Sequence, residues 1–113
     1  MTPTELPGEF EQMVLLAILR RGDEAYALAL VEELERTAGR TVSRGALYRT
    51  LDRLEEKGWV RWTLESTTPD RGGHRRRRFR ATADAVAALQ ASKRALHRLW
   101  DGLDPILGGR RRP

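Results

Sequence analysis

The chain has 113 residues, 40% of them hydrophobic, and carries 21 lysines and arginines against 16 aspartates and glutamates. This length predicts one small domain, to which dimerisation would add useful stability. The lack of cysteine excludes a disulfide framework and a thiolate metal site, and two histidines, His74 and His97, are too few for an ordinary catalytic zinc site. We therefore expect no metal and no cofactor. The longest apolar run, residues 13–19, is too short to span a bilayer, so we expect a cytoplasmic protein without a membrane partner.

The positive charge is concentrated in two segments. Residues 71–80 contain six arginines and no acidic residue, and Arg110, Arg111 and Arg112 form a basic tail. In the rest of the chain the acidic side chains outnumber the basic ones. Such a patch on an acidic body suits the neutralisation of nucleic-acid phosphates. The alternative is a solvated charge run without a partner.

Apolar spacing predicts two helices in the first third of the chain. Phe10, Val14 and Ile18 recur at helical intervals, which predicts a helix over residues 8–21 after a loose arm at 1–7. We expect Asp23 to cap a second helix over 24–37, which Gly39 ends.

The next segment predicts a third helix with a polar outer face. Residues 40–42 read as a short extended segment, with a single strand pair as one possibility, and Ser43 reads as the N-cap of a helix over 44–57. Leu47, Leu51 and Leu54 form its apolar stripe. The opposite face carries Gly45, Tyr48, Arg49, Asp52, Arg53 and Glu56.

The remaining segment predicts a basic hairpin and a long helix. Strands over 59–64 and 75–81 flank turn residues at 66–73, with Phe79 on one face of the second strand and Arg76, Arg78 and Arg80 on the other. Thr82 caps a last helix that continues to about residue 103. We predict a mainly α fold with a small β-hairpin (α+β). It comprises a winged helix-turn-helix domain at 1–82, a C-terminal dimerisation helix at 83–107 and a disordered basic tail at 108–113.

Two motifs carry a family resemblance. Residues 47–60, LYRTLDRLEEKGWV, and residues 73–82, GHRRRRFRAT, resemble the recognition helix and the wing strand of the PadR-like transcriptional regulators. The resemblance spans about residues 6–103. It implies a cytoplasmic homodimer that binds a palindromic operator and represses transcription. It also implies that the C-terminal helix forms the dimer, and some family members bind small aromatic molecules at that interface.

Candidate DNA contacts follow from the third helix and the hairpin. The N-terminal half of the helix is expected in the major groove, where Arg49 contacts a base or a phosphate. Tyr48 donates to a phosphate or packs in the domain, and Arg53 reaches a phosphate or pairs with Glu55 or Glu56. The hairpin arginines are expected along the minor groove, with Arg76, Arg78 and Arg80 favoured because they share a face. The full set is Ser43, Arg44, Gly45, Tyr48, Arg49, Arg53, His74, Arg75, Arg76, Arg77, Arg78 and Arg80.

An apolar stripe on the last helix predicts a dimer interface. It consists of Val86, Leu89, Lys93, Leu96, Trp100 and Leu103, at the spacing of a seam between two helices. The alternative is that the stripe packs on its own domain. Trp100 is also a candidate for stacking a small aromatic ligand.

These features favour a binding protein over an enzyme, because no catalytic constellation or phosphate-binding glycine loop is present. We expect a sequence-specific, homodimeric regulator of transcription that acts on double-stranded DNA, a repressor by family analogy, with release by a small molecule as one possibility. The alternative is a winged-helix protein-interaction module without specific DNA readout.

Overall fold

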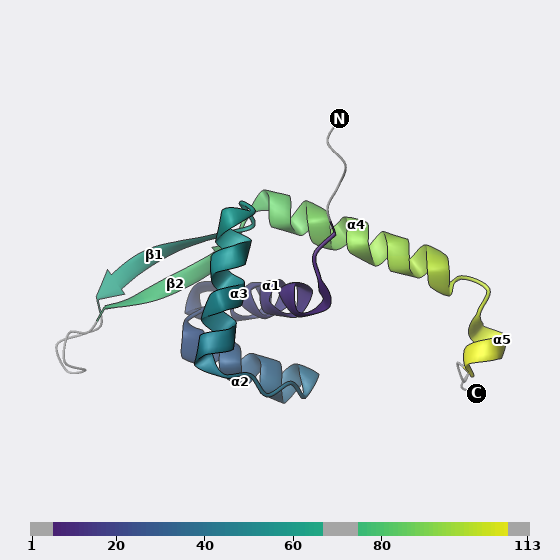
Figure 1. Cartoon of the computed structure of the whole chain (residues 1–113), viewed down its shortest axis with the longest axis horizontal. Helices are drawn as coiled ribbons and strands as arrows, with labels where there is room; N and C mark the ends of the chain where they lie inside the picture. Colours follow the sequence, from purple (N-terminus) through teal and green to yellow (C-terminus); the bar gives the residue numbers. More distant parts are fainter. Residues whose placement is uncertain (1–5, 67–74, 109–113) are drawn as a thin grey trace.

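The computed structural model describes residues 6–66 and 75–108. Its elements follow in chain order: helix α1 (Glu9–Arg21), 3-10 turn η1 (Gly22–Glu24), helices α2 (Ala27–Ala38) and α3 (Arg44–Glu56), strands β1 (Val60–Ser66) and β2 (Arg75–Ala81), and helices α4 (Ala83–Trp100) and α5 (Asp104–Leu107). The hairpin leaves one side of a helical body and α4 leaves the other (Figure 1). The predicted winged-helix architecture is confirmed.

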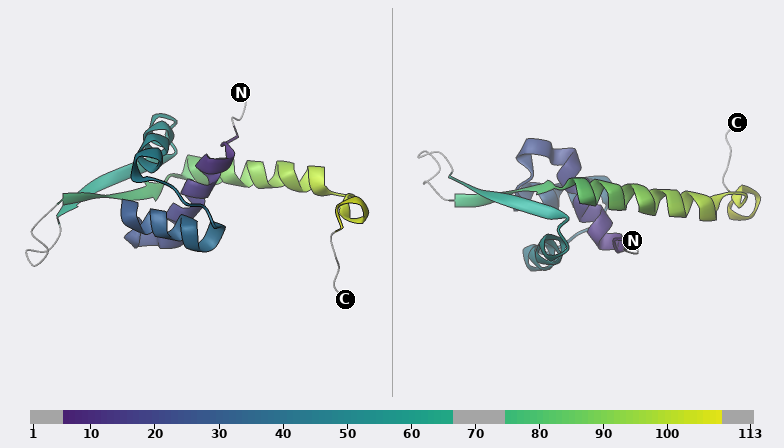
Figure 2. Two further views of the ribbon diagram at one scale, coloured as in Figure 1. Left: turned by 60° about the horizontal axis from the view of Figure 1, so that its bottom comes forward. Right: turned by 90° about the horizontal axis from the view of Figure 1, so that it is seen from above.

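The core lies where the three N-terminal helices meet the base of the hairpin and the start of α4. The predicted stripe of α3 is buried, and Leu15, Leu30 and Phe79 pack with it from α1, α2 and β2. Ala85, Ala88 and Leu89 are the buried apolar residues of α4. The second half of α4 runs clear of this core (Figure 2).

Two predicted caps are confirmed. The Ser43 hydroxyl accepts a hydrogen bond from the Ala46 N–H at 3.1 Å, and the Thr82 hydroxyl accepts one from the Ala85 N–H at 3.2 Å. Each satisfies a backbone donor that has no partner inside its helix. Gly39 ends α2 as predicted, in the left-handed conformation that glycine adopts without strain.

The start of α2 differs from the prediction. Asp23 belongs to the turn η1, and α2 begins at Ala27 with Tyr26 as its N-cap. The reason is a contact with β2: the Phe79 N–H donates to the Ala25 carbonyl at 2.9 Å, and Tyr26 forms a bridge with Arg78. This pairing holds the backbone extended where the local sequence favours a helix.

The segment before α3 and the end of the last helix also differ from the prediction. Residues 40–42 form no strand, and Val42 packs against the core instead. Helix α4 ends at Trp100, because Gly102 takes a positive φ of 78° in the turn that follows. Pro105 lies in the first turn of α5, where its missing N–H is not needed.

The predictions for the two ends fall partly within the described residues. Pro7, assigned to the loose arm, is buried, and its carbonyl accepts a hydrogen bond from the Gln12 side chain at 3.2 Å. Gly108 is the C-cap of α5 rather than the start of a disordered tail. The rest of the arm (1–5), the turn residues 67–73, His74 and the tail 109–113 lie outside the described residues. In the part of the chain that is described, no helix is both long and apolar enough to cross a membrane.

Candidate nucleic-acid interface

Helix α3 presents a polar face to solvent beside the hairpin. Arg44, Gly45, Arg49 and Asp52 are exposed, whereas Tyr48 is half-buried. The Tyr48 ring meets the Phe79 ring edge to face, with centroids 6.4 Å apart. The packing alternative for Tyr48 is therefore realised in this structure, and the contact fixes α3 against the hairpin.

Arg77 lies between α3 and the hairpin, beside two aromatic rings. Its guanidinium carbon lies 4.3 Å from the centre of the Trp62 ring and 6.0 Å from the centre of the Tyr48 ring. The Trp62 indole N–H donates to the Glu55 carboxylate at 3.1 Å, which ties β1 to α3. We call these four residues, Tyr48, Glu55, Trp62 and Arg77, the helix–wing cluster. Stacking on Trp62 positions the Arg77 guanidinium next to the outer face of α3.

The opposite face of the hairpin is anchored to the body. Arg78 donates to the Glu65 carboxylate at 2.6 Å and lies 3.7 Å from Asp23. The Tyr26 hydroxyl donates to the other Glu65 oxygen at 2.8 Å, and the Arg76 guanidinium carbon lies 3.6 Å from the centre of the Tyr26 ring. The hydrogen bonds from Arg78 and Tyr26 lower the pKa of Glu65, and the bond to Glu65 raises the pKa of Tyr26. We call these five residues, Asp23, Tyr26, Glu65, Arg76 and Arg78, the wing anchor.

The anchor changes how the hairpin arginines are ranked. Arg76, Arg78 and Arg80 share a face as predicted, but that face meets η1 and Tyr26 rather than α3. Arg78 already has two carboxylate neighbours, and Arg76 stacks on a tyrosine. Arg77, on the other face, lies beside Tyr48 of the predicted recognition helix. Strand alternation identifies the two faces of the hairpin but does not say which one meets α3.

Arg53 takes a partner that the sequence reading did not name. Its Nε lies 3.8 Å from the Glu11 carboxylate of α1, rather than pairing with Glu55 or Glu56. Glu11 also accepts hydrogen bonds from Lys57 at 3.0 Å and from the Gly8 N–H at 2.9 Å. Burial alone would raise the pKa of Glu11, but the Gly8 N–H and the Lys57 ammonium lower it below its ordinary value.

A second carboxylate, that of Glu33, joins α1 to α2. Glu33 is only 5% exposed and bonds to Arg20 at 2.7 Å, Arg21 at 2.9 Å and the Thr37 hydroxyl. The hydrogen bond from Thr37, followed by those from Arg20, Arg21 and Arg36, lowers the pKa of Glu33 to about 2. A carboxylate with this many donors is held in its charged form, so it serves structure rather than proton transfer.

The predicted interface stripe divides into two halves. Leu89 is buried and Val86 is half-buried against the chain's own domain. This half of the stripe follows the alternative prediction, in which the stripe packs on its own domain. Farther along, Lys93 is exposed, Leu96 is 47% and Trp100 56% exposed, and Leu103 is half-buried. The sequence reading missed Leu99, which is 71% exposed beside this half.

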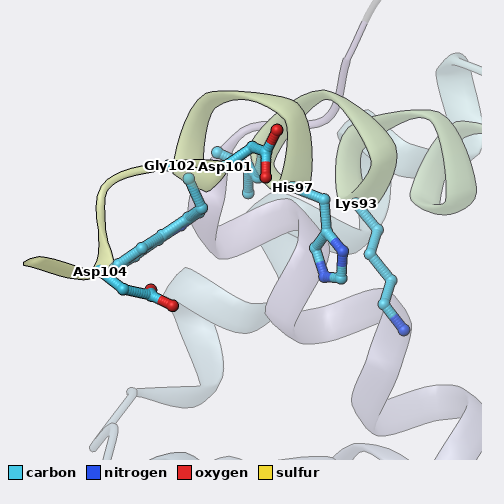
Figure 3. A pocket seen from close by; sticks show the side chains of 7 residues that line it. Lys93, His97, Asp101, Gly102 and Asp104 are labelled. Atoms are coloured by element: carbon cyan, nitrogen blue, oxygen red, sulfur yellow. The ribbon is translucent and has the colours of Figure 1, made fainter. Parts of the chain in front are cut away.

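A hollow of about 480 Å³ lies along the exposed half of α4. Lys93, Leu96, His97 and Trp100 line it from the helix, and the turn after α4 and Asp104 close its end. Figure 3 shows Lys93 and His97 one turn apart on the helix, with Asp104 beyond the turn at Gly102. Trp100, the candidate for ligand stacking, therefore borders a concave surface.

Comparison with known proteins gives consistent matches. The model of the transcriptional regulator PadR-like family matches residues 15–91. The chain is 40% identical over 87 residues to the transcriptional regulator Rv3488 of Mycobacterium tuberculosis, covering 77% of this chain and 74% of that protein.

Solved structures match over nearly the whole chain. A PadR-like regulator from Bacillus cereus matches with a TM-score of 0.69 and 22% identity, over 89% of this chain and 93% of that one. A PadR family regulator from Eggerthella lenta matches with a TM-score of 0.63 and 25% identity, over 88% and 87%.

Proposed function

Because the chain belongs to the PadR-like family of transcriptional regulators, whose members are not enzymes, we propose that it is a homodimeric repressor that binds a palindromic operator. One observation carries the DNA-reading part of this proposal. The exposed face of α3 and the guanidinium of Arg77 lie next to each other at the helix–wing cluster. A helix and an adjacent basic wing can then engage a major groove and the backbone beside it together.

Within α3, the N-terminal half is the part that we propose enters the groove. Arg44, Gly45 and Arg49 carry no negative charge there, whereas Asp52 and Glu56 are exposed farther along and would repel phosphates. Arg49 is the proposed base contact, because a guanidinium pairs in a bidentate way with guanine. The wing arginines supply affinity more than sequence choice.

The dimer is proposed to form through the exposed half of α4. Leu96, Leu99 and Trp100 leave apolar surface uncovered on a helix that projects from the body, and a two-fold dimer would cover it. The hollow beside Trp100 would then border that interface, where a small aromatic ligand could stack and release the operator.

Titration of labelled duplexes with the purified protein tests the DNA-binding proposal. One duplex comes from upstream of the protein's own gene and the other is scrambled, and both are titrated at two salt concentrations. We expect tight binding to the upstream duplex that weakens steeply with salt. Arg49→Ala should cost about 1–3 kcal/mol on that duplex and much less on the scrambled one. A reporter gene behind the operator should rise in expression when the protein is absent.

A second candidate, a winged helix that binds protein, is favoured by the acidic half of α3. Exposed Asp52 and Glu56 would suit a basic partner surface better than a phosphate backbone. Indifference of the protein to every duplex, even at low salt, would favour this candidate and remove the repressor proposal. Equal salt-sensitive binding to both duplexes would restrict the arginines to phosphate contacts.

A further inference from the structure

A cleft at the start of α3 gathers several basic side chains, and one of them, Arg40, has no part in the proposed function. Its volume is about 360 Å³, and it is lined by residues 40–43 between α2 and α3, by residues of α3 and by Phe10 of α1. Arg40, Arg49 and Arg53 line it, and Thr41 and Ser43 add hydroxyl groups. No carboxylate is among the side chains that line it in the described structure. Three guanidinium groups therefore border one solvent-open space.

Arg40 is held toward this cleft by α1. Its guanidinium carbon lies 4.9 Å from the centre of the Phe10 ring, and its Nη1 lies 3.8 Å from the Met13 sulfur. Neither contact neutralises its charge. Within the described ranges, no carboxylate lies within ion-pair distance of Arg40 or Arg49. A stacked arginine with an uncompensated charge is already ordered for an anionic ligand.

The charge of Arg53, which also lines the cleft, is compensated only in part. It lies 3.8 Å from Glu11, but Glu11 is closer to Lys57, at 3.0 Å. The positive charges of the cleft therefore exceed the negative charge within reach. Like charges that converge without a counter-charge repel one another, and a bound anion removes that repulsion.

We propose that this cleft binds a phosphate group, with Arg40 as the clamping residue. The planar fork of a guanidinium matches the oxygens of a phosphate, and Arg40 and Arg53 can hold it from two sides while Arg49 keeps its proposed base contact. On the premise of the proposed function, the phosphate belongs to the duplex backbone, because Arg49 also borders the part of α3 assigned to the groove. A free phosphate offers the same chemistry, and the experiment separates the two sources.

The first arm measures duplex binding by the full-length Arg40→Gln protein. A lost phosphate contact lowers affinity by the same factor on operator and scrambled DNA, and it lowers the slope of log affinity against log salt by about 0.9. The loss is then about three- to fourfold larger at about 50 mM than at about 200 mM salt. Arg94→Gln removes the same charge from an exposed site on α4 and should leave the slope unchanged.

The second arm titrates inorganic phosphate into the protein without DNA. Backbone amide signals of residues 41–46 are followed by NMR, against chloride at matched ionic strength and pH. Saturable shifts in the native protein that Arg40→Gln abolishes would confirm a phosphate site. If these shifts appear while duplex binding is unaffected by Arg40→Gln, the source is a free phosphate.

Unchanged duplex binding together with absent phosphate shifts would overturn the inference. Failure of the native protein to bind any duplex would instead remove the proposed function. In that case the phosphate titration alone decides whether the cleft is a site.

Discussion

Replacing Leu96 by alanine should weaken dimerisation without altering the domain that reads DNA. Leu96 is 47% exposed in the single chain, so about half of its side chain remains to be buried by a partner. Full burial of a leucine side chain is worth about 1.5–3 kcal/mol, so the half still exposed is worth about 0.7–1.5 kcal/mol. A two-fold interface contains the residue twice, which gives a loss of about 1.5–3 kcal/mol. The dimer Kd should therefore rise about 10- to 150-fold.

Sedimentation equilibrium over a range of protein concentrations measures this Kd directly. Leu28→Ala is the matched control, because Leu28 is 58% exposed but lies on α2, away from α4. The thermal unfolding midpoint, taken at concentrations where both variants are monomeric, reports any damage to the fold. We expect the Leu28 variant to dimerise as the native protein does.

A native protein that stays monomeric at every concentration would refute the reasoning about α4. An unchanged dimer Kd for the Leu96→Ala protein would also refute it, because the exposed half of Leu96 would then not be buried by a partner. A dimer weakened by Leu28→Ala and not by Leu96→Ala would move the interface to α2.

Three other predictions concern the described clusters. The pKa of Glu33 is about 2 in the folded chain, below its ordinary value, so its charge stabilises the fold above about pH 4.5 and this contribution disappears as the pH falls toward 2. The difference in unfolding temperature between the native protein and Glu33→Gln should therefore shrink over that range. A difference that stays constant would contradict this prediction. Ser43→Ala should lower the free energy of unfolding by about 1 kcal/mol in urea titrations, because the first turn of α3 loses its cap. Arg77→Gln should weaken duplex binding, lower the slope of log affinity against log salt and change the fluorescence of Trp62. Arg78→Gln breaks the wing anchor, so it should lower the unfolding temperature more than Arg77→Gln does.

Local signals in the sequence were sufficient for most of the fold. The spacing of Leu47, Leu51 and Leu54 is a property of one helix, and the caps at Ser43 and Thr82 act within one turn. These predictions hold because the structure adds nothing that competes with them.

The wrong boundary of α2 has a distant cause. Ala25 and Tyr26 pair with a strand that lies about fifty residues away along the chain, and no nearby residue signals this contact. The hairpin arginines could not be ranked from the sequence for the same reason. The alternation of side chains along β2 does not show that Glu65 and Tyr26 lie on the face that carries Arg76 and Arg78. Arg40 was passed over because its partner, Phe10, lies thirty residues earlier.

The departure of the hairpin and α4 from opposite sides of the body has a consequence for operator length. In a dimer joined through α4, the length of that helix sets the separation of the two DNA-binding domains. Each residue of an α-helix adds about 1.5 Å along the axis, so deleting seven residues from α4 would move each DNA-binding domain about 10 Å closer to the dimer interface. Half-site spacing could then diverge between related regulators through insertions in one helix, while α3 and the wing keep their sequence preference.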